Sequence, residues 1–403
     1  MKEIRDNFIV KDQNEDIVIG LSSDEINEKY IRGEIRIITE QARYPLDTIS
    51  SMLASGKYNL NPEYQRRKRW STVQQSKLIE SFIINVPIPP IFLYEVEYAK
   101  YEVMDGLQRL TAIDNFYKGK FALEGLEEWQ ELNGKRYEEL PSKVKEGIDR
   151  RYLSSIVLLN ETAKDKLQAE SLKKIVFGRL NSGGDKLTPQ ETRNALYGGK
   201  FNTCCIKLSQ NEYFRKLWKF DIIQKNENGE INNEDELLKT DSYKKMVDVE
   251  LVIRFFAYRH IDKMSTLGNQ EILIDEYLKQ ANFFPDEVID DLCALFEQCV
   301  KILYMVFGDK ALLMPDGAQK KITPTKTIYD PIMQSISKFI NREDLILSKK
   351  DELLDNKFKD KSALIIKGRH QDIDLFDGKY GGKKDVENRI IYFDNYFNSI
   401  INA

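Results

Sequence analysis

The sequence predicts an α+β protein, in which a small α/β unit is followed by a mostly helical region. Segments with strand-like patterns are concentrated before about residue 160, whereas apolar residues recur at helical spacing from about residue 140 onward. The chain has 403 residues, 41% of them hydrophobic, which exceeds the size at which a single core stops growing. We therefore expect two or three domains.

Helices and strands alternate in the first part of the chain. The strand segments are rich in β-branched and aromatic residues, and the helical segments carry apolar residues every third or fourth position. The proline-rich segment 86–90 suits neither a helix nor a central strand. In chain order we expect a strand at 34–38, helices at 44–55 and 70–84, strands at 91–96 and 101–104, and a helix at 107–117.

The helical period dominates the rest of the chain, with one short strand candidate at 155–159. We expect helices at 167–180, 189–197, 243–259, 269–281, 286–307, 324–340 and 385–401. Together these patterns predict an N-terminal extension at 1–40, an α/β domain at 41–135 and a mostly helical region at 136–403.

The composition argues against a dedicated binder of duplex DNA and against a membrane protein. Lys and Arg number 61 and Asp and Glu 65, which gives a net charge of −4, whereas tight DNA binding usually requires a basic excess. A local basic patch remains compatible with this total. No stretch approaches the ~18 apolar residues of a membrane span, and the N-terminus has no apolar signal segment. We expect a cytoplasmic protein.

The cysteines and histidines match no familiar metal site. The four cysteines are Cys204, Cys205, Cys293 and Cys299. Their spacing does not fit structural zinc, and a disulfide is not expected in a chain of this size, so we interpret all four as buried or neutral thiols. The two histidines, His260 and His370, are far apart, so the pairing that HNH or HExxH nuclease and protease sites need is missing.

The first motif is the segment Asp-Gly-Leu-Gln-Arg-Leu-Thr at 105–111. It falls where a predicted strand meets a predicted helix, so free backbone amides at the helix start favour a phosphate. A glycine there permits a positive φ or a close approach, and an arginine supplies a forked cation. The candidate residues are Asp105, which would hold a divalent metal or fix the arginine, Gly106, Gln108, Arg109 and Thr111. A helix cap with Asp105 as the N-cap explains the same residues equally well.

The second motif is the basic segment 62–70. It carries Tyr64, Gln65 and Arg66, followed by further basic residues and Trp70. Basic residues flanked by aromatic ones suit phosphate or nucleic acid, but a solvated loop before a helix, anchored by Trp70, has the same composition.

The third motif is the glycine-rich turn around Asn181 and the helix start that follows it. Thr188, Pro189 and Glu191 form the pattern of a capping box with proline at the first helical position. A helix–turn–helix joint accounts for the turn. The density of polar residues between Arg179 and Asn194 also suits the lining of a site.

Taken in order, the three motifs resemble the N-terminal domain family of GmrSD-type restriction endonucleases. That family shows a Pro-x-Tyr-Gln-Arg segment, an Asp-Gly-Gln-Gln-Arg motif and a later Arg-Leu-Asn-x-Gly-Gly segment continuing to Gln-Glu-x-Arg-Asn-Ala. Here the matching segments are 62–66, 105–109, 179–184 and 190–195, and the resemblance runs from about residue 44 to 200.

The resemblance implies a ParB/sulfiredoxin-like nucleotide-binding fold for residues 41–135. It makes Asp105, Gln108 and Arg109 essential for binding and hydrolysis of a nucleoside triphosphate, with Mg²⁺ at Asp105. It also places Tyr64, Gln65 and Arg66 in the phosphate pocket, together with Gly106 and Thr111, and Asn181 at its helical side. Because no P-loop sequence is present, such an NTPase would be of a non-P-loop kind.

The chain departs from the family pattern in two places. Leu107 stands where the motif has its first glutamine, and the HNH nuclease domain that many members carry is not recognisable. The resemblance therefore implies an anti-phage defence protein that binds and hydrolyses a nucleotide and acts with, or gates, a separate DNA-cleaving partner. The alternatives are a non-catalytic, nucleotide-switched regulator that binds DNA or protein, and a nuclease that uses carboxylates around Asp105 and Glu191. Candidate partners are DNA, a nuclease subunit and a second copy of the chain.

Overall fold

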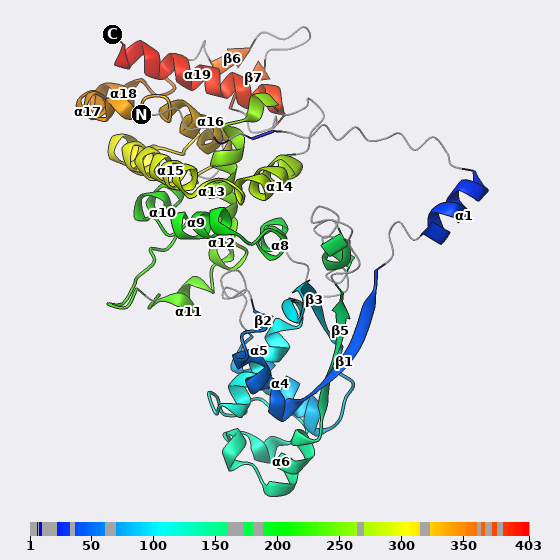
Figure 1. Ribbon diagram of the computed structural model, residues 1–403. Helices are drawn as coiled ribbons and strands as arrows, with labels where there is room; N and C mark the ends of the chain where they lie inside the picture. Colours follow the sequence, from blue (N-terminus) through cyan, green and yellow to red (C-terminus); the bar gives the residue numbers. More distant parts are fainter. Residues whose placement is uncertain are drawn as a thin grey trace. The chain divides into compact units, whose positions relative to one another are not determined.

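The computed structural model divides the chain into two compact units, and each is described by itself below (Figure 1). One unit comprises residues 14–196, and the other comprises residues 1–13 together with 197–403. The structure describes residues 6, 8–9, 22–32, 37–60, 70–159, 172–173, 175–179, 188–229, 231–263, 270–314, 323–360, 364–366, 373–376 and 382–402.

The unit 14–196 is built on a mixed five-stranded sheet. Its strands are β1 (Thr39–Pro45), β2 (Tyr58–Asn59), β3 (Ile91–Glu97), β4 (Lys100–Asp105) and β5 (Tyr152–Leu158). The spatial order is β1-β5-β3-β4-β2. The pairs β1/β5 and β3/β4 are antiparallel, and β3/β5 and β2/β4 are parallel. The strand β5 is thus an inner strand, although it comes last in the sequence.

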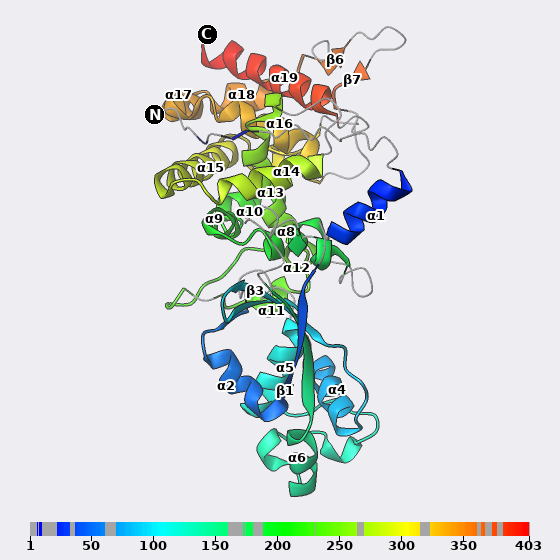
Figure 2. The ribbon, with the colours of Figure 1, turned by 45° about the vertical axis from the view of Figure 1, so that its right-hand side comes forward.

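Helices pack against the sheet of this unit through one shared core (Figure 2). The unit as a whole contains the helices α1 (Ser23–Arg32), η1 (Leu46–Thr48), α2 (Ile49–Ala54), α4 (Thr72–Ile83), α5 (Leu107–Tyr117), η2 (Gln130–Leu132), η3 (Tyr137–Glu139), α6 (Ser142–Asp149) and α8 (Pro189–Leu196). The core joins residues of α2, α4, α5 and α6 to one face of the sheet, where Leu93 and Val103 contribute. The described residues 172–173 and 175–179 are also helical.

The second unit is mostly helical. Its elements are α9 (Lys200–Leu208), α10 (Glu212–Trp218), α11 (Glu234–Leu237), α12 (Asp241–Lys244), α13 (Val247–Tyr258), η6 (Ile261–Lys263), α14 (Gln270–Ala281), α15 (Asp286–Phe307), η7 (Gly308–Lys310), α16 (Lys326–Ile336), η8 (Ile340–Arg342), α17 (Glu343–Ser348), α18 (Lys350–Asn356), β6 (Ile365–Ile366), β7 (Ile373–Asp374) and α19 (Lys383–Ile401). Residues of α13 are almost all buried, so this helix lies at the centre of the unit.

The predicted α+β class is confirmed, with the strands of the five-stranded sheet in the first unit and helices dominating the second. The helix predicted at 107–117 has those bounds in the structure. The segment 44–55 differs from the prediction, because residues 44–45 complete β1 and the helix starts as the 3-10 turn η1. Of the strand predicted at 34–38, only 37–38 are described, and β1 begins at Thr39.

The boundary between the units lies at 196/197, whereas the sequence placed it near residue 135. The reason is the position of β5, which pairs with both β1 and β3 and so ties residues up to 158 to the sheet. The N-terminal extension also divides, because residues 1–13 belong to the helical unit.

The expectation of four free thiols is wrong for two of them. Cys204 of α9 and Cys293 of α15 form a disulfide, while Cys205 and Cys299 are buried free thiols. The pairing is invisible in the sequence because 89 residues separate the partners, and only the packing of α9 against α15 brings them together.

His260 has a structural environment, as expected. It is buried, and its Nε2 lies 2.8 Å from the carboxylate of Asp6. His370 lies outside the described residues.

Within the described part of the chain, no helix is both long and apolar enough to cross a bilayer.

Candidate functional site

The junction between β4 and α5 depends on a glycine. Gly106 is the N-cap of α5 and has φ +95°, a left-handed conformation that residues with a side chain rarely adopt. A Cβ at this position would also lie within 2.9 Å of Ile91 Cβ on the neighbouring strand β3. The positive φ expected for this glycine is therefore confirmed, and Ile91 of the neighbouring strand fills the side on which a Cβ would lie. The proposal of Asp105 as the N-cap is corrected, because Gly106 occupies that position.

Asp105 and Arg109 form an ion pair one helical turn apart. The Asp105 Oδ2 lies 2.6 Å from the Arg109 Nη2, and the Arg109 Nη1 donates to the backbone oxygen of Pro89. The side chain of Arg109 is 12% exposed and that of Asp105 43% exposed. Arg109 is thus held from two sides, and the half-exposed carboxylate remains accessible to solvent.

The start of α5 presents backbone amides to the space beyond β4. The first intrahelical bond of the helix runs from the amide of Leu110 to the oxygen of Gly106, at 3.0 Å. Helix geometry leaves the amides before it without an intrahelical acceptor, and the helix dipole favours negative charge there. With the guanidinium of Arg109 beside them, these groups suit a phosphate.

The other motif residues on α5 have different environments. The Gln108 Oε1 accepts a hydrogen bond of 3.2 Å from the backbone N–H of Trp70, which ties α5 to the residue just before α4. Thr111 is half-buried on the same helix. Leu107 is 9% exposed and belongs to the hydrophobic core, so this position supplies packing instead of the polar group of the family motif.

Several predicted site residues cannot be placed beside this junction. Tyr64, Gln65, Arg66 and Asn181 lie outside the described residues. Trp70, the first described residue after the basic segment, is half-buried and packs against the core, as expected for an anchor.

The capping box predicted at the start of α8 is confirmed. The Thr188 N–H donates to Glu191 Oε2 at 2.7 Å, and the Glu191 N–H donates to Thr188 Oγ1 at 3.2 Å. The carboxylate of Glu191 is therefore engaged locally, which weakens the nuclease alternative that relied on it.

Beyond the cap, α8 carries a buried polar network. The Gln190 amide donates to Asn194 Oδ1 at 2.9 Å, and Arg193 Nη1 donates to Gln190 Oε1 at 3.4 Å. All three side chains are at most 2% exposed. The sequence predicted a polar cluster here, and the structure shows that these members of it are buried and bonded to one another.

Metal binding at the junction would rest on one carboxylate. Among the described residues, no group of three or more His, Cys, Asp or Glu side chains is arranged to hold a metal ion. Mg²⁺ in nucleotide sites is commonly held by one or two carboxylates together with substrate phosphates, so the half-exposed Asp105 fits this role.

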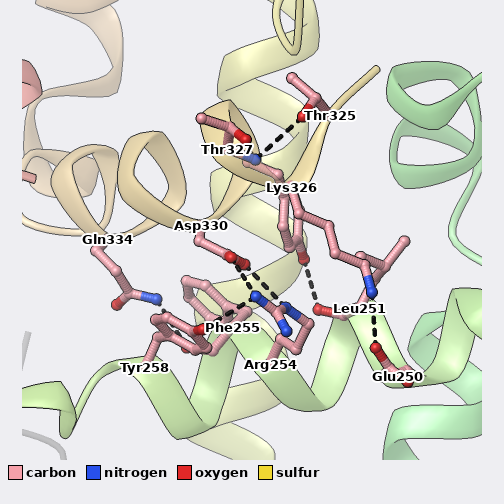
Figure 3. Close-up of polar contacts among 11 residues, drawn as sticks. Glu250, Leu251, Arg254, Phe255, Tyr258, Thr325, Lys326, Thr327, Asp330 and Gln334 are labelled. Atoms are coloured by element: carbon pink, nitrogen blue, oxygen red, sulfur yellow. Dashed lines mark hydrogen bonds and ion pairs between the residues drawn. The ribbon is translucent and has the colours of Figure 1, made fainter. Parts of the chain in front are cut away.

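The helical unit contains a second polar cluster, shown in Figure 3. Arg254 of α13 makes a two-point contact with Asp330 of α16, and its Nη2 also donates to the Tyr258 hydroxyl at 3.0 Å. Gln334 Nε2 donates to the backbone oxygen of Phe255 at 2.8 Å. These groups are buried and mutually bonded, so we interpret the cluster as a link between two helices and not as a site.

Sequence reasoning missed two residues that shape the junction, and the contact that a third, Trp70, makes there. Pro89 supplies the carbonyl that holds Arg109, Ile91 enforces the glycine, and Trp70 binds Gln108 through its backbone. The proline-rich run before β3 was the available signal for Pro89. The other two contacts join segments that are distant in sequence, and no local pattern marks them.

Comparison with known families gives one match. Residues 49–198 match the family model described as GmrSD restriction endonuclease, N-terminal domain. The matched segment begins at α2, ends just after α8 and contains the β4–α5 junction. No curated protein and no solved structure matches the chain. The family description indicates a role in restriction-type defence against phage. Residues 49–198 of this chain are thus similar to the N-terminal domain of GmrSD restriction endonucleases.

Proposed function

We propose that the unit 14–196 binds a nucleoside triphosphate at the start of α5 and hydrolyses it as part of restriction-type defence. The observation that carries the proposal is the β4–Gly106–α5 junction, where the first amides of the helix, which have no intrahelical acceptor, lie beside a pre-oriented arginine. Gly106 adopts a left-handed conformation and packs against Ile91, so a residue with a side chain would displace the start of α5. The order of the three family motifs in the sequence supports the same assignment.

In this proposal each residue of the junction has a separate role. Arg109, fixed by Asp105 and Pro89, stabilises negative charge on the phosphates without having to reorganise. The exposed part of the Asp105 carboxylate holds Mg²⁺ or orients the attacking water. When bound, Mg²⁺ neutralises charge on the phosphate oxygens. Gln108 is positioned by its bond to Trp70.

Residues outside the described part of the chain complete the proposed pocket by resemblance. Arg66 would hold phosphates together with Arg109, Tyr64 and Gln65 would flank it, and Asn181 would close the helical side. The proposal also includes a separate DNA-cleaving partner or a gated contact with DNA, because the sequence has neither a histidine pair for an HNH site nor a basic excess.

A non-catalytic switch is the second candidate, and one observation favours it. Leu107 is buried in the core, so the first glutamine of the family motif is replaced by a residue that cannot reach a ligand. Such a domain would retain phosphate binding through its backbone and Arg109 but would have one polar group fewer for catalysis.

The test is to measure binding and phosphate release for the four ribonucleoside triphosphates with Mg²⁺, in wild type, Arg109→Ala and Asp105→Ala. Lys118→Ala is the matched control, because Asp114 and Lys118 form another pair four residues apart on α5, 2.8 Å apart and one helix length from the junction. We expect turnover to fall by at least about 100-fold in both site variants and to be unchanged in the control.

Each outcome separates the candidates. Turnover that disappears in both site variants supports the hydrolase. Binding without turnover in wild type, lost in Arg109→Ala, supports the switch. If wild type neither binds nor hydrolyses any of the four nucleotides, the junction is structural and both candidates fail.

A further inference from the structure

The second face of the sheet, opposite the core of α4 and α5, is covered around Tyr94 and Glu102. Side chains alternate between faces along a strand, so Tyr94 and Glu102 point away from the face of Leu93 and Val103. Tyr94 is 8% exposed and pairs directly with Glu102 across β3 and β4.

A helical segment at 172–179, of which all residues but 174 are described, contacts this second face. The Lys173 Nζ lies 2.6 Å from the Glu102 Oε2 and 5.9 Å from the centre of the Tyr94 ring. Leu172 and Phe177 of the same segment are 6% and 3% exposed. The buried apolar residues of the segment and the ion pair of Lys173 with Glu102 thus hold it against β4.

The Lys173–Glu102 pair is more buried than the other ion pairs among the described residues of the unit. Both side chains are 12% exposed, whereas Lys77 and Glu127, also 2.6 Å apart, are 50% and 72% exposed. A solvated pair contributes little, but a partly desolvated pair is expensive to break, because the remaining charge is left without compensation. Burial of this kind fixes one relative position of the two elements.

We propose that Lys173 is a positioning residue for the nucleotide site, acting through Glu102. Glu102 lies three residues before Asp105 on β4, and Lys173 lies six residues before Arg179, where the third family motif begins. The ion pair therefore fixes the helical stretch that includes Arg179 against the strand that ends in the Asp105–Gly106 junction. This inference rests on the proposed nucleotide site.

The test uses the full chain and measures the affinity for the nucleotide that wild type binds, with Mg²⁺. Lys173→Met keeps the length of the side chain and removes its charge, Lys173→Arg keeps the charge, and Lys173→Glu with Glu102→Lys reverses the pair. Lys77→Met is the control, since it breaks a pair of the same length that is exposed. Circular dichroism and a thermal melt establish that each variant is folded at the temperature of the assay.

We expect Lys173→Met to weaken binding about 10- to 100-fold, the loss that follows when a displaced site no longer makes one charge-assisted hydrogen bond to a phosphate. Lys173→Arg and the reversed pair should return the affinity to within about threefold of wild type, and Lys77→Met should leave it unchanged. A merely structural role would lower the melting temperature of Lys173→Met without this pattern of rescue.

The failures are distinguishable. If wild type binds nucleotide and folded Lys173→Met binds it equally well, the positioning role is wrong and the proposed function stands. If the reversed pair folds but does not recover affinity, the ion pair is not the cause. If wild type binds no nucleotide, the proposed function and this inference fall together.

Discussion

Gly106 shows how one residue constrains both a turn and a site. Its backbone conformation and the proximity of Ile91 each exclude a side chain, for independent reasons. Gly119, at the other end of α5, shares the positive φ, at +63°, but a Cβ there would meet no atom within 4 Å. Comparing alanine at the two positions therefore separates the free-energy cost of the left-handed backbone from that of the clash with Ile91.

We predict that Gly106→Ala lowers the free energy of unfolding of the unit 14–196 by about 2–4 kcal/mol, because strain and overpacking add. Gly119→Ala should cost only about 1–2 kcal/mol, the price of the left-handed backbone alone. Hydrogen exchange of the α5 amides measures both. Equal losses in the two variants would show that Ile91 moves aside and that the close approach is not required.

The amino group of Lys357, at the end of α18, lies in a desolvated environment. Its Nζ donates to the backbone oxygens of Lys310 and Ala311, at 2.8 and 2.6 Å, and lies 5.3 and 5.0 Å from the rings of Phe307 and Phe358. Burial lowers the pKa of this lysine to about 7. Since an unfolded chain restores the ordinary pKa near 10.5, the unfolded state binds more protons than the folded state between these values.

We predict that wild type gains stability relative to Lys357→Met as the pH rises from 7 to 9, by about 2 kcal/mol. The sign follows from the lowered pKa: the folded state carries an unfavourable buried charge below pH 7 and loses it above. Urea unfolding at several pH values measures the difference. Lys359→Met, which removes an exposed lysine two residues away, should show no such trend. If the difference in unfolding free energy between wild type and Lys357→Met does not change with pH, the pKa of Lys357 is not lowered in the folded state.

At the scale of elements, α13 and α16 are joined by polar groups inside a hydrophobic unit (Figure 3). The Arg254 and Asp330 side chains are 8% and 6% exposed, and two guanidinium nitrogens of Arg254 contact the carboxylate. The same pair of helices carries a second ion pair, Lys326–Glu250, at 2.8 Å but with side chains 43% and 20% exposed. The Arg254–Asp330 pair is thus shielded from solvent, whereas the Lys326–Glu250 pair on the same two helices is accessible to water.

We predict that Asp330→Asn, which keeps the shape and removes the charge, destabilises the helical unit by about 3–5 kcal/mol, because Arg254 is left buried and uncompensated. Glu250→Gln, the matched change at the exposed pair, should cost no more than about 1 kcal/mol. Thermal or urea unfolding of the two variants gives the comparison. Similar small losses in both would mean that water reaches the Arg254 guanidinium.

At the scale of the whole molecule, the helical unit includes the first residues of the chain. Phe8 is 1% exposed, with its ring centre 5.1 Å from that of His260 and 5.0 Å from that of Tyr277. Asp6 contacts His260, and Gln280 bonds both backbone groups of Ile9, at 3.1 and 2.6 Å.

The charge of Asp6 is favoured by its partners. Burial by itself would raise the pKa of Asp6, but the hydrogen bond and charge of His260 and the charge of Arg259 outweigh it and lower the pKa below 3.8. The lowered pKa means that the carboxylate of Asp6 loses its contribution to stability as the pH falls through its folded-state value. Residues 14–196 are inserted between this N-terminal segment and the rest of the unit to which it belongs.

We predict that Phe8→Ala lowers the stability of the helical unit by about 3–5 kcal/mol, the cost of emptying a buried aromatic site. Phe283→Ala, at a position 74% exposed in the same unit, should change it by less than about 0.5 kcal/mol. Faster hydrogen exchange in α13 and α14 of the first variant alone would confirm that the N-terminal segment completes this core. Unchanged exchange would show that it is dispensable.

The sequence alone was sufficient to predict features that depend on residues close together in the chain. The period of apolar residues defines α5, the Thr188–Glu191 pattern defines the start of α8, and the strand-to-helix junction with its glycine marks the candidate site. Each depends on residues within a few positions of one another, where backbone geometry leaves few options.

Contacts between distant segments were decided only by the tertiary structure. The insertion of β5 between β1 and β3, the Cys204–Cys293 disulfide and the Lys173–Glu102 pair each join residues separated by dozens of positions. The same pattern of apolar residues is compatible with many ways of placing these segments beside one another. The arrangement that buries the apolar faces of the helices and of the sheet together is the one that forms. The sequence by itself therefore determined the α+β class, the local elements and the motif at the start of α5. Packing alone decided which residues surround that motif, because the free energy that fixes them is shared among elements far apart in the chain.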